Sequence, residues 1–379
     1  MTGNRPKSRP EDLLAEGGVL VELLRVPAAL FGAIARTRGM LYDRGLLPAV
    51  RAEVPVVCVG NITAGGTGKT PMVVWLARKL QASEHRPGIL SRGYGKAGVS
   101  GDQSDEARLY GELLGDLPRV AMADRIVGAA RLVEMGAGLV LMDDGFQHRR
   151  LARDLDLVLV DATRPWGLAR PSEGGPPVRA FLPRGLLREA PAALGRAGAI
   201  VITRSDQVTE TELADLEFEL AAAAPTVPRL LAITAPSSLA PLFEGEPGDS
   251  PSPDPDALRG KSVQLCSAIG NPASLEAVVE SLGATVLDHL RFADHHEYEV
   301  EDLAGLVDPD AMILITAKDA VKLRKLGRRA LGNLAPRLYV LSIEFHVTRG
   351  EALLDELLSQ LPEGRVNLHL ANLHEGLHG

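Results

Sequence analysis

The chain of 379 residues is long enough for two domains, and its 45% hydrophobic and 24% charged residues are typical of an ordinary globular protein rather than a disordered or fibrous one. A net charge of −8 argues against a general nucleic-acid binder, which needs a positive surface, so we expect no nucleic-acid partner. The two cysteines, Cys58 and Cys266, lie in apolar runs and are interpreted as reduced, buried thiols in the cytosolic compartment. We expect neither a signal peptide nor a membrane span, because no run approaches the ~20 apolar residues that a span needs.

The first 50 residues predict a basic amphipathic helix. Residues 1–51 hold eight Arg and Lys residues against five acids, so this arm is positive on a negative chain. From Pro27 onward the apolar residues share one helical face: Leu30, Phe31, Ile34 and Leu41. Arg36 lies on the other side, and Gly45 suits the helix end. Such a helix either packs on the protein's own core, which is the commoner case, or lies in the interface of an anionic membrane.

Short β-branched runs alternate with helical patterns along most of the chain, which is typical of a parallel sheet flanked by helices. Several runs are apolar at successive positions, as expected when both faces of a sheet are covered. We predict strands at Val54–Val59, Gly88–Leu90, Arg119–Met122, Leu139–Met142, Leu157–Val160, Ala199–Thr203, Arg229–Ile233, Ser262–Ser267, Thr285–Leu287, Met312–Thr316 and Leu338–Ile343.

A stretch rich in Pro, Ser, Gly and acids divides the predicted strands into two series. It spans residues 236–256 and is interpreted as a linker or surface insertion, because it cannot bury a core. We therefore predict a first domain over residues 51–230 and a second α/β domain over residues 231–379. The last dozen residues, with three His, predict a flexible tail.

The segment VPVVCVGNITAGGTGKTP, residues 54–71, predicts a phosphate-binding loop between a strand and a helix. Its glycines let successive backbone N–H groups face an anion at the helix N-terminus. Lys69 can reach the β- and γ-phosphates, and the Thr70 hydroxyl can bind Mg²⁺. The strict motif has Gly where this chain has Thr63, and the alternative is a glycine-rich surface turn. The predicted ATP-binding residues are Thr63, Ala64, Gly65, Gly66, Thr67, Gly68, Lys69 and Thr70.

An apolar strand ends in a pair of acids, Asp143 and Asp144, in LVLMDDGFQHRR. In phosphate-loop enzymes a strand-terminal aspartate holds Mg²⁺, and two adjacent carboxylates are costly without a cation between them. The alternative, a plain strand-to-turn Asp-Gly, is common. Together with the phosphate loop and the alternating strands and helices, the pair predicts an α/β fold with a mostly parallel sheet of the P-loop NTPase type.

Five further segments are weak when taken singly: LSRGYGK, SDEARL, PRGLLRE, FADHHEY and LITAKDAVKL. Arg92 and Arg188 by themselves are interpreted as solvated arginines. In their order along the chain, however, the Arg-rich N-terminal helix, the two motifs above and the blocks SRGYG, LPRGLLRE, FADHH and TAKDAVK resemble the bacterial tetraacyldisaccharide 4′-kinase family over about residues 25–325. Thr63 in place of the first glycine is similar to what this family carries.

The resemblance implies a lipid kinase built from a P-loop NTPase-like α/β/α sandwich, which holds the nucleotide site, plus a second, smaller α/β/α lobe. Members of the family use MgATP to phosphorylate the 4′-hydroxyl of a tetraacyl glucosamine disaccharide 1-phosphate in lipid A biosynthesis, at the cytoplasmic face of the inner membrane. Carried over by position, Asp143 and Asp144 resemble the Mg²⁺-binding pair, and Gln147 a polar neighbour of the nucleotide or metal. Asp105 and His295 resemble the pair that activates the sugar hydroxyl. Around Asp105 this chain has S-D-E-A where the family usually has G-D-E-P. Lys69 acts on the transferred phosphate, and Glu189 is a further candidate metal ligand.

This chemistry is coherent from the residues alone. Phosphoryl transfer to an alcohol needs charge neutralisation on the γ-phosphate, supplied by Lys69 and Mg²⁺, and a base for the hydroxyl proton. An imidazole paired with a carboxylate suits that role near neutral pH. Because an acylated disaccharide stays in a bilayer, residues 1–50 are expected to contact the cytoplasmic leaflet of the inner membrane as a peripheral segment.

Two other functions compete with this one. A regulatory or metal-insertion GTPase is suggested by Thr203-Arg204-Ser205-Asp206 and Thr316-Ala317-Lys318-Asp319, which loosely resemble the guanine-reading N-K-x-D loop but lack its Asn-Lys start. A membrane-associated ATPase that positions other proteins would hydrolyse ATP without a lipid acceptor.

Overall fold

The computed structural model describes residues 10–93, 105–170, 177–243, 254–294 and 296–362. The predicted C-terminal tail from residue 363, part of the predicted linker (244–253) and His295 lie outside the described residues. The strands are β1 (Val56–Asn61), β2 (Pro87–Ser91), β3 (Arg119–Ala121), β4 (Leu139–Asp143), β5 (Leu155–Asp161), β6 (Ala199–Thr203), β7 (Arg229–Pro241), β8 (Ser262–Ser267), β9 (Thr285–Arg291), β10 (Met312–Thr316) and β11 (Leu338–Arg349). Each predicted strand is therefore confirmed in place, with small shifts at several ends and with β7 and β11 extending well beyond their predicted ends.

The α-helices among the described residues connect and flank these strands. They are α1 (Pro10–Glu16), α2 (Val19–Glu22), α3 (Arg25–Asp43), α4 (Lys69–Ala82), α5 (Asp105–Leu114), α6 (Arg125–Glu134), α7 (Glu210–Ala223), α8 (Pro272–Ser281), α9 (Ala317–Leu326), α10 (Arg328–Leu331) and α11 (Glu351–Ser359). Short 3₁₀ helices span Pro191–Arg196, Pro255–Leu258, Val300–Gly305 and Gly332–Arg337.

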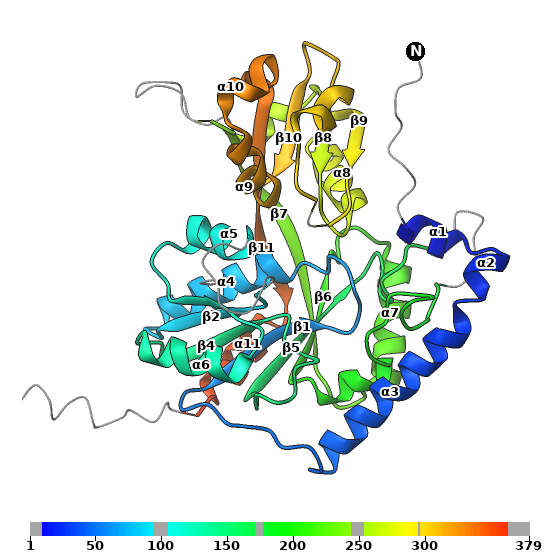
Figure 1. Ribbon diagram of the computed structural model, residues 1–379, viewed down its shortest axis with the longest axis vertical. Coiled ribbons are helices and arrows are strands. Elements are labelled where there is room, and N and C mark those ends of the chain that lie inside the picture. Colours follow the sequence, from blue (N-terminus) through cyan, green and yellow to red (C-terminus); the bar gives the residue numbers. More distant parts are fainter. Residues whose placement is uncertain (1–9, 94–104, 171–176, 244–253, 295, 363–379) are drawn as a thin grey trace, which may run out of the picture.

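All the strands belong to one sheet, in the order β3-β2-β4-β1-β5-β6-β7-β11-β10-β8-β9. Every neighbouring pair is parallel except β7 and β11, which are antiparallel. This pair divides the sheet into a phosphate-loop half, from β3 to β7, and a second half, from β11 to β9. In Figure 1 the second half lies above the phosphate-loop half, and the long strands β7 and β11 run from one to the other. The α/β fold with a mostly parallel sheet is confirmed.

The predicted linker begins too early. Residues 236–241 belong to β7 and pair with β11, where Pro236 faces Ile343 and Pro241 faces Tyr339. Beyond Leu231, β7 has no further partner in β6, so its prolines occupy an edge that needs no N–H donor. The composition of this stretch is thus compatible with an edge strand as well as with a loop. The division into domains near residue 230 stays a prediction.

The core of the phosphate-loop half forms because its central strands are apolar on both faces. All six residues of β1 are buried, and α4 covers one face with Met72, Leu76 and Leu80. The carboxyl-terminal helix α11 adds Leu354 and Leu358 to the same cluster. This packing fixes the end of β1 and the start of α4, between which the predicted phosphate loop lies.

The predicted amphipathic helix is confirmed as the 19-residue α3, which lies along the outer flank of the phosphate-loop half (Figure 1). Its closest packing against the phosphate-loop half is made through small residues, since Ala28 and Gly32 are its buried positions. A Cβ on Gly32 would lie 2.6 Å from Phe181 Cδ2, so any larger residue here would force the Phe181 ring to shift. Among the described residues, none of the helices is both long and apolar enough to cross a membrane.

Candidate active site

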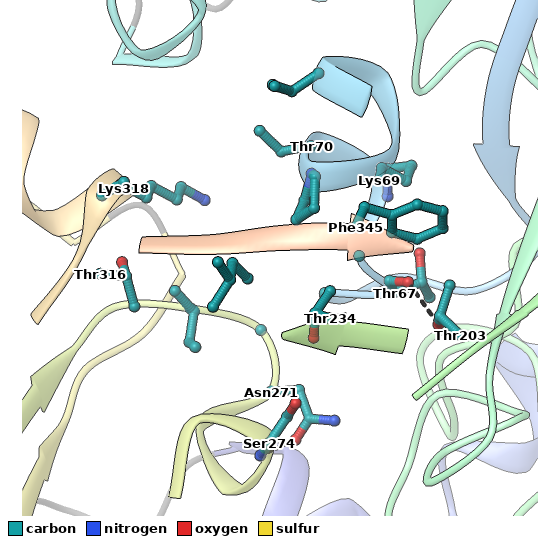
Figure 2. A pocket seen from close by; sticks show the side chains of 18 of the residues that line it. Thr67, Lys69, Thr70, Thr203, Thr234, Asn271, Ser274, Thr316, Lys318 and Phe345 are labelled. Atoms are coloured by element: carbon teal, nitrogen blue, oxygen red, sulfur yellow. Dashed lines mark hydrogen bonds between the residues drawn. The ribbon is translucent and has the colours of Figure 1, made fainter. Parts of the chain in front are cut away.

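The loop between β1 and α4 has the conformation that a glycine-rich phosphate loop requires. Gly65 and Gly68 have φ values of 106° and 88°, in the left-handed region that favours glycine. Thr67 fixes the loop, because its hydroxyl accepts a hydrogen bond from the Asn61 side chain (3.0 Å) and its carbonyl accepts one from the Thr203 hydroxyl (3.0 Å; Figure 2). The loop ends at the N-terminus of the 14-residue α4, where the helix dipole and free N–H groups stabilise an anion.

Thr63 and Ala64 support the loop from behind. Thr63 is 2% exposed and forms a bridge with Leu187, and the Ala64 N–H donates to the Leu186 carbonyl (2.7 Å). Neither residue is among the described residues that line the cavity in front of the loop. These contacts hold the start of the phosphate loop against the LPRGLLRE segment, residues 182–189.

A cavity of about 840 Å³ opens in front of the loop, between the two halves of the sheet. Figure 2 shows Lys69 and Thr70 of the loop on one side and Thr316 and Lys318 of the second half on the other. Apolar side chains complete the lining, among them Trp75 on α4, Leu109 and Leu113 on α5, and Phe345 on β11. The size and mixed lining suit a nucleotide together with part of a second substrate.

Asp143, the last residue of β4, is buried in the cavity wall with 4% exposure. Its Oδ2 accepts a hydrogen bond from the Tyr110 hydroxyl (2.7 Å), whereas its Oδ1 is buried and has no hydrogen-bond partner in the described part of the chain. Burial raises the pKa of Asp143, because the charged form lacks solvent. A buried carboxylate oxygen without a partner fits a cation, so Asp143 is suited to hold Mg²⁺.

Asp144 is paired differently. Both of its oxygens accept from Arg188 Nη1 (3.0 Å each), and one lies 3.4 Å from Lys69 Nζ. Burial alone would raise the pKa of Asp144, but the charges of Lys69 and Arg188 lower it to about 2. Its φ of 52° places it in the left-handed region, directly beside the phosphate loop. Asp144 therefore stays ionised and gathers two cations where phosphates would bind.

The described residues contain no cluster of three or more His, Cys, Asp or Glu side chains that could hold a metal ion. Asp143 and Thr70 both line the cavity, and phosphate oxygens would have to complete the coordination, as is usual for Mg²⁺. The carboxylate of Glu189 pairs with Arg196 (2.8 Å) and accepts from Gln147 Nε2 (3.1 Å). Neither Glu189 nor Gln147 is among the described residues that line the cavity.

The structure places the surroundings of the predicted Asp105–His295 pair at this cavity. Asp105 begins α5, whose Leu109 and Leu113 line it. His295 lies outside the described residues, but its neighbour Asp294 lines the cavity and forms an ion pair with Lys318 (2.6 Å). The two segments thus border one cavity, and the pairing of the two side chains stays a prediction.

Two features of the site escape the sequence analysis. Arg188 is not a freely solvated arginine, because it pairs with Asp144 and its side chain is 27% exposed. The turn after β8, which contains Gly270 and Asn271, lies against the phosphate loop: a Cβ on Gly270 would lie 2.1 Å from the Gly66 nitrogen. The only sequence signal for this turn is a Gly-Asn-Pro between an apolar strand and a helix start.

Side chains from both halves of the sheet hold this turn in place. Asn271 Nδ2 donates to Asp161 Oδ2 (3.0 Å) and to the Thr163 hydroxyl (3.1 Å). Arg204 forms an ion pair with Asp161 and donates through Nε to the Ser274 hydroxyl (2.6 Å). Since Asp161 ends β5 and Ser274 lies in α8, this network joins the two halves at the phosphate loop.

The phosphate loop lies at the carboxyl end of a parallel sheet, and its lysine lies beside a strand-terminal pair of aspartates. This arrangement defines a nucleoside-triphosphate-dependent phosphotransferase of the P-loop class. Comparison with known proteins identifies the family within this class. The family model LpxK, tetraacyldisaccharide-1-P 4'-kinase, matches residues 20–362. The chain belongs to this family of kinases.

Individual relatives are similar to this protein in sequence along almost the whole chain. A tetraacyldisaccharide 4'-kinase of Anaeromyxobacter sp. (strain K) is 37% identical over 95% of this chain and 96% of its own length. The corresponding protein of Syntrophus aciditrophicus (strain SB) is 35% identical over 90% of this chain and 93% of its own. A crystal structure of LpxK from Aquifex aeolicus in complex with ATP matches 90% of this chain and 99% of its own, with a TM-score of 0.64 and 28% identity.

Proposed function

We propose that this protein transfers the γ-phosphate of ATP to the 4′-hydroxyl of a tetraacyl glucosamine disaccharide 1-phosphate, a step of lipid A biosynthesis. The observation that carries the proposal is the phosphate loop lying beside Asp143 and Asp144 at a cavity with room for a second substrate. The family supports the acceptor, since its members are named for this reaction. The related Aquifex aeolicus protein, which was crystallised in complex with ATP, supports the donor.

The residues around the loop divide the work of binding the triphosphate. Backbone amides from Gly65 to Thr70 and the N-terminus of α4 would bind the phosphates, and Lys69 would exchange its contact with Asp144 for the β- and γ-phosphates. The Asp143 carboxylate and the Thr70 hydroxyl would hold Mg²⁺, which supplies neutralisation of the phosphate charge when bound. Arg188, kept in place by Asp144, adds a second cation at the loop.

Asp105 and His295 are proposed to activate the acceptor. As the 4′-oxygen forms its bond to the γ-phosphorus, the bond from that phosphorus to the β,γ-bridging oxygen breaks and ADP leaves. The hydroxyl proton passes to one member of the Asp105–His295 pair, and the other member orients the acceptor and stabilises the pair as it takes up the proton. Replacing either by Ala should lower kcat by about 10²–10⁴-fold while ATP binding is kept. A folded Asp105→Ala or His295→Ala protein with wild-type kcat would refute this assignment.

The decisive test combines the purified protein with ATP and the disaccharide 1-phosphate lipid. We expect a lipid product heavier by one phosphate, together with one ADP for each product molecule. ATP hydrolysis without a phosphorylated lipid would favour the ATPase alternative instead.

Contact with the membrane is proposed for α3. Its buried side carries small residues, while Leu23 just before it and Val26, Leu30 and Ile34 within it are 60–77% exposed. These residues recur at helical spacing and form an apolar stripe in the first half of the segment. An apolar stripe of this kind on a basic arm suits the cytoplasmic leaflet of the inner membrane, where a lipid acceptor would be met.

Sedimentation with anionic vesicles tests this contact. The double variant Leu30→Ser, Ile34→Ser should weaken vesicle binding by at least about tenfold, since burial of each side chain contributes about 1.5–3 kcal/mol. The matched control is Phe218→Ser, which removes a 78%-exposed apolar side chain from α7. Equal effects of the two variants, or none, would contradict a role of α3 at the membrane.

The GTPase alternative is not favoured. Asp319, which would read the base in one of the two candidate loops, is fully buried and accepts hydrogen bonds from the Tyr298 hydroxyl (2.9 Å) and the Ala268 N–H (2.9 Å). In the other loop, Thr203 and Arg204 are bound to Thr67, Asp161 and Ser274, as described above. Preference for GTP over ATP in a competition assay would reverse this conclusion.

A further inference from the structure

The carboxyl-terminal part of α3 is fastened to the loop that follows Asp143 and Asp144. Arg38 Nη1 donates to the Gln147 carbonyl (2.9 Å). In the opposite direction, Arg149 Nη1 donates to the Gly39 carbonyl (3.0 Å) and pairs with Asp43 (2.6 Å). The guanidinium carbons of Arg38 and Arg149 lie 5.2 and 5.0 Å from the centroid of the Tyr42 ring. Contacts in both directions fix the helix against this loop in position and in rotation.

The same loop reaches the phosphate loop through one side chain. Gln147 Nε2 donates to the Asn61 carbonyl (2.8 Å), and Asn61 Nδ2 donates to the Thr67 hydroxyl (3.0 Å). Asn61 and Thr67 are 0% and 4% exposed, so water does not compete for these bonds. A continuous series of hydrogen bonds thus runs from Arg38 on the helix surface, through Gln147 and Asn61, to the phosphate loop.

We propose that Arg38 and Arg149 are positioning residues for nucleotide binding, and that α3 is a structural support of the phosphate loop as well as a membrane contact. The inference rests on the proposed function. The two tasks use different ends of α3. The apolar stripe around Leu30 and Ile34 is exposed, whereas the polar contacts gather at residues 38–43. Loss of the polar contacts therefore loosens the phosphate loop without removing the stripe.

The experiment measures two quantities on the full-length protein. The first is the Kd of the Mg²⁺ complex of AMP-PNP, a non-hydrolysable ATP analogue, by calorimetry, and the second is sedimentation with phosphatidylglycerol-containing vesicles. Arg38→Ala is compared with Arg44→Ala, which removes the same charge from the end of the same helix, at an exposed side chain without a hydrogen bond or ion pair to the described residues. Both variants should weaken vesicle binding equally, by the loss of one positive charge.

Only Arg38→Ala should weaken analogue binding, by about fivefold to tenfold, as expected for a lost charged hydrogen bond. Arg38→Lys, which keeps a donor, should recover part of this loss. Leu30→Ser, Ile34→Ser should do the opposite, weakening vesicle binding and leaving the Kd of the analogue within twofold. Arg149→Ala should behave as Arg38→Ala does, and the Arg38 variants decide the outcome if it fails to fold.

Two results would overturn the inference: a folded Arg38→Ala protein that binds the analogue as the wild type does, or an equal loss in Arg44→Ala, which would reduce the effect to charge. Failure of the wild-type protein to bind the analogue would overturn the proposed function itself, and the inference with it.

Discussion

Gly270 offers a direct way to test whether the second half of the sheet completes the nucleotide site. In Gly270→Ala the new Cβ would lie 2.1 Å from the Gly66 nitrogen and 2.7 Å from its Cα. Both atoms belong to the backbone of the phosphate loop, which cannot rotate aside as a flexible side chain would. The turn must therefore retreat from the loop, or the loop must deform.

The magnitude follows from the packing. Overpacking by one methyl group costs about 1–3 kcal/mol. Suppose that this energy destabilises only the arrangement in which the Gly270 turn contacts the phosphate loop. The population of that arrangement, relative to one in which turn and loop are separated, then falls by about 5-fold to 150-fold, since 1.4 kcal/mol is a factor of ten. We expect kcat/KM for ATP to fall within this range, because Gly270 and Asn271 line the cavity together with the loop.

The assay is lipid phosphorylation at varied ATP concentration, with thermal unfolding as a check of folding. Gly195→Ala is the matched control, because a Cβ at Gly195 meets nothing within 4 Å and its backbone is not in the left-handed region. A folded Gly270→Ala enzyme with wild-type kcat/KM would show that the turn does not need to touch the phosphate loop during catalysis.

Three further predictions concern titratable groups. In Asp143→Asn, Mg²⁺ should no longer increase nucleotide affinity, because the unpartnered Oδ1 loses its charge; calorimetry with and without Mg²⁺ measures this. The pKa of Asp144, about 2, lies below its ordinary value of 3.8. Ionised Asp144 therefore adds about 2 kcal/mol to the free energy of unfolding above pH 4, and this contribution is lost as the pH falls towards 2. In Asp144→Asn, the free energy of unfolding measured with urea should fall less steeply with pH over this range. Burial and nearby arginines lower the pKa of His148 to about 4, so the unfolded chain takes up a proton near pH 6.5 that the folded chain refuses. Stability should therefore fall between pH 6.5 and 4, and less steeply in His148→Asn.

The sequence predicts those parts of the fold that depend on local pattern. Strands β6, β8 and β10 begin and end where their apolar runs do, because burial on both faces requires such runs. Strands β7 and β11 extend well beyond their predicted ends, because their outer parts pair with each other along the backbone, in sequence where only isolated apolar side chains such as Leu239 and Phe345 are buried. The pairing of residues about a hundred positions apart has no local signal, so the composition of this proline-rich strand predicts a linker instead.

The candidate site divides in the same way. Gly65, Gly68 and Lys69 could be predicted because their chemistry depends on neighbours in the chain. The role of Arg188 depends on Asp144, which is 44 positions away, and that of Gly270 on Gly66, which is 204 positions away. Such contacts are set by the topology of the sheet, and isolated motifs do not reveal them.

One topological feature explains why these distant residues meet. Asn61, Asp143, Asp161 and Thr203 are the last residues of β1, β4, β5 and β6, so the parallel strands of the phosphate-loop half deliver their polar ends to one edge. The antiparallel pair of β7 and β11 reverses the direction of every strand in the second half. The carboxyl ends of β8 and β10, with the Gly270 turn and Thr316, therefore point back towards that edge. In a single parallel sheet the carboxyl ends of all the strands would point the same way. The reversal instead places the cavity between the carboxyl ends of the two halves, so that each half supplies one wall of the site.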